Sequence, residues 1–118
     1  MKKFLVLYQI PTSVMDEWKQ TSADERKSAE DKMGREIQAW TGGRGKLFTD
    51  RGAGLGKAKR ITSSGVSDAR NDLVMYAIVQ GESQDAVAKS FESHPHLQIP
   101  QSSIEVMELF ALPDQPRK

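Results

Sequence analysis

The sequence predicts an α+β domain in which two short, apolar strands lie at the centre of a sheet. The runs Phe4 to Tyr8 and Leu73 to Val79 are apolar throughout and rich in strand-forming residues. A long stretch with helical periodicity, Ser22 to Gly42, lies between them. Strands that are apolar on both sides are typical of a sheet whose two faces are both covered.

Length and composition bound the class of protein. A chain of 118 residues fits a single domain, predicted over residues 1–112, with a polar tail over residues 113–118. A net charge of only +1 among 28% charged residues is typical of a soluble protein and does not favour nucleic-acid binding. The absence of cysteine excludes disulfides. The first apolar run ends at Gln9, too short for a membrane span, so we expect a cytoplasmic protein without a membrane partner.

Two helices are predicted in the first third of the chain. A short one covers Ser13 to Trp18, and a longer one begins at the capping box Ser22 to Glu25. The longer helix ends at Gly42 and carries an apolar stripe formed by Ala29, Met33, Ile37 and Trp40.

The middle of the chain gives weaker signals. Lys46 to Asp50 predicts a strand, and the glycines that follow predict a turn. Ala58 to Thr62 is expected to return as an edge strand, and Ser63 to Asn71 to be an exposed loop.

The last third predicts a helix and a strand. Ser83 is expected to cap a helix whose apolar stripe contains Val87 and Phe91. Because a residue before proline avoids helical geometry, Pro95 places the end of this helix at or just before His94. The final strand is expected over 104–110.

This order of elements fits the ferredoxin-like βαββαβ sandwich, in which two helices cover one face of the sheet. The two-sided apolar strands require cover for the other face as well. Because the chain has no further helix, we expect that cover to be a second copy, giving a homodimer packed sheet on sheet.

Several segments resemble the YCII-related family of small proteins. The likeness is clearest in Ser93 to Leu97, in Ile104 to Glu108, and in the pair Met1 to Val6 with Asp50 to Leu55. The resemblance implies a dimeric ferredoxin-like fold of the α/β-barrel type, a pocket between helix and sheet, and a histidine–aspartate pair as acid–base machinery. This chain lacks the Asp-Gly-Pro-Phe segment of the better-known branch, so the family's aspartate has no counterpart before the Leu73 strand.

His94 and His96 are the candidate catalytic residues, because only imidazoles have an ordinary pKa near neutrality. A carboxylate would have to orient one ring, with Asp50 as first choice and Glu105 as second. The structural alternative is that His94 interacts with the last carbonyls of the preceding helix and His96 anchors the turn.

Other sites were weighed on the same residues. The two histidines with Glu92 or Asp50 supply too few ligands for a metal site, and we expect no metal and no cofactor. The glycine-rich segment Gly52 to Lys57 misses the spacing of a phosphate-binding loop. Trp40, Phe48 and Trp18 are candidates for lining an apolar ligand pocket.

Basic residues gather around the glycine-rich segment, among them Arg51, and would attract a small anionic organic molecule. The leading hypothesis is therefore a homodimer with a small-molecule pocket, in which a histidine carries out cofactor-independent acid–base chemistry. The alternative is a non-catalytic dimeric module that binds a metabolite or a protein, and the sequence leaves open whether the protein is an enzyme.

Overall fold

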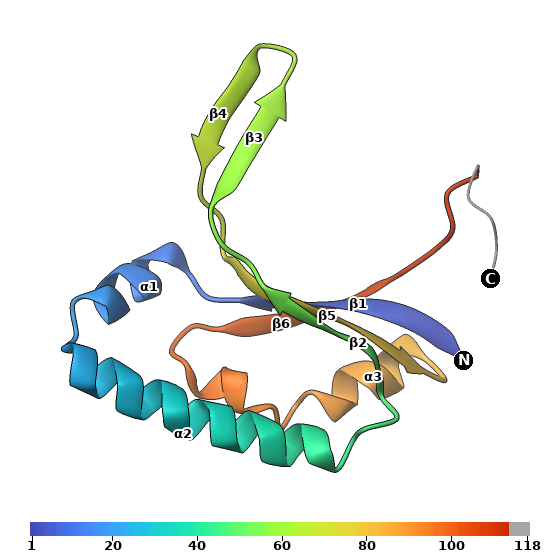
Figure 1. The fold of residues 1–118 in the computed structure, drawn as a ribbon. Helices are drawn as coiled ribbons and strands as arrows, with labels where there is room; N and C mark the ends of the chain where they lie inside the picture. The colour runs from blue at the N-terminus through green and yellow to red at the C-terminus, as the bar shows by residue number, and fades with distance from the viewer. Residues whose placement is uncertain (114–118) are drawn as a thin grey trace.

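A four-stranded antiparallel sheet with helices on one face forms the body of the molecule, described by a computed structural model over residues 1–113 (Figure 1). The elements follow in the order β1 (Lys2–Gln9), α1 (Thr12–Lys19), α2 (Ala23–Gly42), β2 (Phe48–Gly54), β3 (Ala58–Thr62), β4 (Gly65–Ala69), β5 (Leu73–Gly81), α3 (Gln84–Ser90), the 3-10 helix η1 (Pro95–Gln98) and β6 (Ser103–Glu108). The predicted α+β class is confirmed. The predicted tail, from residue 114 on, lies outside the described residues.

The sheet has the strand order β2-β5-β1-β6, so the two apolar runs of the sequence occupy its centre as predicted. Val6 marks the middle, paired with Ala77 on one side and Val106 on the other, and it is completely buried. Alternate residues of β1 point to opposite faces. Phe4, Val6 and Tyr8 therefore face the helices, whereas Leu5 and Leu7 face the other side.

The core lies between the sheet and helices α2 and α3. Its buried side chains come from the centre of the sheet and from one end of each helix, namely Phe4, Val6, Tyr8, Ala77, Val79, Trp40, Val87 and Phe91. The opposite face of the sheet carries no element of the described chain, and its central residues Leu5, Leu7, Tyr76 and Ile78 are only half-buried. We expected both faces of the sheet to be covered. Within one chain, the helices cover one face and the other face is uncovered in the described residues.

Helix boundaries follow the sequence where side-chain caps define them. The hydroxyl oxygens of Ser22 and Ser83 accept hydrogen bonds from the amides of Glu25 and Ala86, each at 3.1 Å, and thereby begin α2 and α3 as predicted. The end of α3 differs, because the helix stops at Ser90, four residues before His94. The expectation that His94 avoids helical geometry is confirmed, since its backbone is extended, as is usual for a residue before proline.

The loop expected over 63–71 is wrong, because residues 65–69 form β4 and pair with β3 in a separate two-stranded hairpin. The Thr62 hydroxyl accepts a hydrogen bond from the Ser64 amide at the turn, and Gly65 adopts a positive φ of 130°. The hairpin projects away from the helices, with Ile61 and Val66 paired near its tip at 77% and 68% exposure (Figure 1). Its short, mostly polar sequence gives only a weak strand pattern.

The turn expected over Gly52, Gly54 and Gly56 is wrong at the first two glycines, because β2 continues through Gly52 as a bulge opposite β5 and ends at Gly54. The strand Ala58 to Thr62 therefore does not return along β2 as an edge strand but pairs with β4. Gly52 has a φ of 74°, and a Cβ atom there would lie 1.8 Å from the Tyr76 carbonyl oxygen. The bulge therefore requires glycine for both its backbone conformation and its close contact with β5.

Replacing the glycine inside α2, Gly34→Ala, is expected to raise the free energy of unfolding by about 0.5–1 kcal/mol, because alanine restricts the unfolded chain and its Cβ meets no atom. The matched change Gly52→Ala is expected to lower it by on the order of 1–3 kcal/mol. Urea denaturation followed by circular dichroism measures both. Equal effects at the two positions would contradict the assignment of Gly52 to a strained bulge.

Candidate functional site

The two histidines are buried in an aromatic cluster between the sheet and the end of α2. His94 is 3% exposed and His96 is 6% exposed. The His94 ring centroid lies 4.6 Å from that of Trp40 and 5.1 Å from that of Tyr8, and the His96 ring lies 5.3 Å from Tyr8. Phe91 completes the cluster, with its ring stacked on His94 at 5.9 Å.

His94 is the N-cap of η1 and does not form the C-terminus of α3, which corrects the expected contact with the last helical carbonyls. Its Nδ1 accepts a hydrogen bond from the His96 amide at 3.0 Å, so the neutral ring carries its proton on Nε2. Burial is the largest cause that lowers the pKa of His94 to about 4, and the nearby His96 and Arg44 contribute to the same shift. The imidazole is therefore neutral near pH 7.

His96 joins the segment after α3 to the end of β1. Its Nε2 lies 3.0 Å from the Gln9 carbonyl oxygen, to which the protonated nitrogen donates. Burial lowers the pKa of His96, while its backbone contacts with Gln9 and Ser103 oppose that shift. The Ser102 hydroxyl donates to the His96 carbonyl oxygen at 2.9 Å, so this residue anchors the turn, as the structural alternative expects.

We expected the carboxylate of Asp50 or Glu105 to orient an imidazole ring. Each of these residues instead lies opposite a strand residue that faces away from the helices. Asp50 pairs with Ile78, and Glu105 pairs with Leu7. Since Ile78 and Leu7 alternate with buried residues of the helix side, these carboxylates lie across the sheet from the histidines. The Asp50 Oδ1 instead accepts a hydrogen bond from the Gly52 amide at 2.8 Å and stabilises the bulge.

The aromatic and basic candidates divide between the core and the surface. Trp40 is buried, and Phe48 packs on it with ring centroids 6.0 Å apart. Arg51 is exposed on the edge strand β2. Trp18 is the candidate aromatic residue that lines a cavity, between α1 and α2.

Two residues that sequence reasoning did not select hold Trp40 in place. Its indole Nε1 donates to the Ser93 hydroxyl at 3.1 Å, and the Arg44 guanidinium lies 4.4 Å from the centre of its ring. Arg44 also donates to the Trp40 carbonyl oxygen at 2.9 Å. The spacing of four residues between Trp40 and Arg44 at a helix end is the signal that could have indicated this contact.

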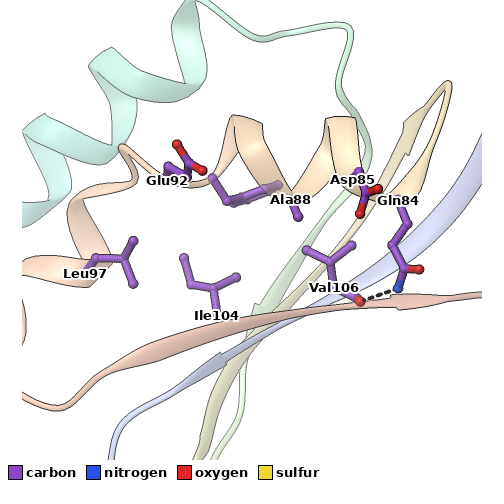
Figure 2. A pocket seen from close by; sticks show the side chains of 8 residues that line it. Gln84, Asp85, Ala88, Glu92, Leu97, Ile104 and Val106 are labelled. Atoms are coloured by element: carbon purple, nitrogen blue, oxygen red, sulfur yellow. Dashed lines mark hydrogen bonds between the residues drawn. The ribbon is translucent and has the colours of Figure 1, made fainter.

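A groove of about 430 Å³ runs between α3 and β6, beside the histidine segment (Figure 2). Figure 2 shows Ala88, Leu97, Ile104 and Val106 on its walls and the carboxylates of Asp85 and Glu92 on the helix side. The Gln84 amide group donates to the Val106 carbonyl oxygen at 3.0 Å and joins the two elements at one end. Phe91 separates this groove from the His94 ring, because it lines the groove and stacks on the imidazole.

Residues 1–113 contain no group of three or more histidine, cysteine, aspartate or glutamate side chains arranged to hold a metal ion. Within the same residues, no helix is both long and apolar enough to cross a membrane.

Stability should fall in acid because the pKa of His94 is lower in the folded protein than in the unfolded chain. Protons then bind the unfolded state first, so the free energy of unfolding decreases from about pH 6.5 down to about pH 4, by on the order of 3 kcal/mol from His94 alone. The variant His94→Asn retains a side-chain acceptor for the cap but does not titrate. Urea denaturation between pH 7 and pH 4 should give a flatter profile for this variant, and parallel profiles would contradict the prediction.

No protein-family model matches this chain, and no curated protein matches it. The likeness to the YCII-related family therefore stays an expectation from the sequence. What the geometry shows by itself is a pair of neutral, buried imidazoles that connect the helices to the central strand, with cavities on either side of the segment that carries them.

Proposed function

We propose that this chain is a ferredoxin-like, YCII-related domain that forms a homodimer sheet on sheet and acts as a non-catalytic module for binding a small molecule. The strand order β2-β5-β1-β6, with every neighbouring pair antiparallel, supports the ferredoxin-like arrangement. The observation that carries the dimer is the apolar face of the sheet opposite the helices.

That face presents apolar side chains from three adjacent strands, flanked by the carboxylates of Asp50 and Glu105. Leu5 pairs with Ile78 and with Met107, and Leu7 pairs with Tyr76. Paired residues lie on the same face of a sheet, so these five side chains are neighbours. Met107 is 48% exposed. A second copy would bury the same five residues against themselves about a two-fold axis, which is the commonest symmetry of soluble oligomers.

The surroundings of the histidines favour a binding module over an enzyme. A general base needs a proton acceptor that reaches substrate and a pKa suited to the working pH. His94 uses its Nδ1 within the chain and its pKa lies near 4, and His96 is bonded to a strand carbonyl. Acid–base chemistry by His94, His96 and Asp50 stays a prediction from the sequence, as do the anionic ligand at Arg51 and the cytoplasmic location.

The dimer is tested by the mass in solution. Sedimentation at micromolar concentration should give twice the 13.2 kDa mass of one chain. Met107→Lys should shift the mass to that of one chain, because a charge buried in an apolar interface is costly.

Leu97→Lys is the matched control, since Leu97 is an apolar residue of similar exposure, 40%, on the helix side of the molecule. This variant should remain a dimer. A monomeric wild type, or monomerisation by both variants alike, would overturn the sheet-on-sheet arrangement.

A further inference from the structure

A second and larger cavity lies between α1, α2 and the residues that follow the histidine segment. Its volume is about 720 Å³, within the range of about 300–1,000 Å³ that is typical of small-molecule sites. Most of its lining is apolar, and the residues that shape it include Val14, Met15, Trp18, Met33, Ile37 and Ile99. We refer to it as the α1–α2 cleft.

The cleft uses apolar side chains that the core does not cover. In α2, only Trp40 and Thr41 are buried, although Ala29, Met33 and Ile37 continue the same stripe. No residue of α1 is buried either, and Met15 and Trp18 line the opposite wall. An apolar cleft of this size on the surface between two helices is typical of a small-molecule site.

Hydrogen bonds and an ion pair position the elements that flank the cleft. The Pro11 carbonyl oxygen accepts a hydrogen bond from the Met15 amide at 3.1 Å at the start of α1. On its outer side, α1 is joined to the base of the hairpin by an ion pair of 2.9 Å between Asp16 and Arg70. On the other wall, the Gln98 side chain donates to the Glu36 carboxylate at 2.8 Å and joins η1 to α2.

The polar groups at the cleft select the charge of its ligand. Three carboxylate residues line it, Glu17, Glu30 and Glu36, against a single basic residue, Lys32. An excess of one sign around an apolar cavity raises the local concentration of ligands with the opposite charge. Trp18 adds a ring face that attracts cations, and the thioethers of Met15 and Met33 adapt to different apolar shapes.

We propose that the α1–α2 cleft binds a small organic cation, with an aromatic or branched apolar body between the helices and an amine against the carboxylates. The site rests on the binding-module part of the proposed function and does not depend on the dimer. Its ligand has the opposite charge to the one that the sequence predicted around Arg51, which lies on a different element.

The experiment compares three probes with the same body, namely 4-phenylbutylamine, 4-phenylbutanol and 4-phenylbutyrate, on the full chain. The chain has two tryptophans, so two indole N–H resonances report separately on the cleft through Trp18 and on the core through Trp40. The amine should shift the Trp18 resonance saturably and leave that of Trp40 in place. Its affinity should exceed that of the carboxylate by about fivefold or more, as expected for an exposed charge contact.

Two variants locate the site. Gly34 lines the cleft from α2, so Gly34→Leu introduces a branched apolar side chain there and should abolish binding of all three probes. Ala39→Leu places the same side chain on an exposed position of α2 outside the cleft and should leave binding unchanged. Glu30→Gln should weaken the amine but not the alcohol.

Equal affinities for the amine and the carboxylate would overturn the charge selection. A shift of Trp40 in place of Trp18, binding that survives Gly34→Leu, or no binding by any probe at millimolar concentration would overturn the site itself. The sedimentation mass of the same sample tests the dimer separately from the ligand site. A chain that binds no probe but has twice its monomer mass would contradict the site and still support the sheet-on-sheet dimer.

Discussion

The contact between Tyr8 and the His94-Pro95-His96 segment is the interaction on which the arrangement of the layers depends. Tyr8 lies on the central strand, is 1% exposed, and touches the rings of Phe91, His94 and His96 on the helix side. Burial raises the pKa of its phenol to about 12, in keeping with a water-poor environment. The Gln9 carbonyl oxygen, one residue further along the strand, bonds His96. One short stretch of β1 thus holds the end of α3, the start of η1 and, through Trp40, the end of α2.

This role explains why the His94-Pro95-His96 segment, which the sequence predicts as a catalytic site, makes mainly structural contacts. The imidazole of a buried histidine has two nitrogens, and these form hydrogen bonds or pack against aromatic rings. The carboxylates that would turn such a pair into an acid–base site are placed on the other face by the two-residue period of the strands. A single-residue change of register in β6 would have moved Glu105 to the histidine side.

The sequence predicts those elements whose signals are local and strong. The hydroxyl caps at Ser22 and Ser83 and the apolar runs of β1 and β5 were predictable because each depends on a few adjacent residues. The bulge at Gly52 was not, since its requirement for glycine comes from the approach of the Tyr76 carbonyl on another strand. The helical periodicity predicts that Met33 and Trp40 lie on one apolar stripe of α2. It does not predict that Trp40 enters the core while Met33 faces a cleft, because tertiary packing decides this.

The hairpin of β3 and β4 has a consequence for how the molecule opens. Within the described residues, this two-stranded ribbon is held by its own ladder, by the exposed ion pair of Lys59 with Asp68, and at its base by the exposed ion pair of Arg70 with Asp16. Its amide hydrogens are therefore expected to exchange with solvent through local opening, at a free-energy cost far below that of the amides of β5, which sit between two other strands. The chain thus contains two β-structures that differ in lifetime, one cooperative with the core and one that opens and closes independently of it.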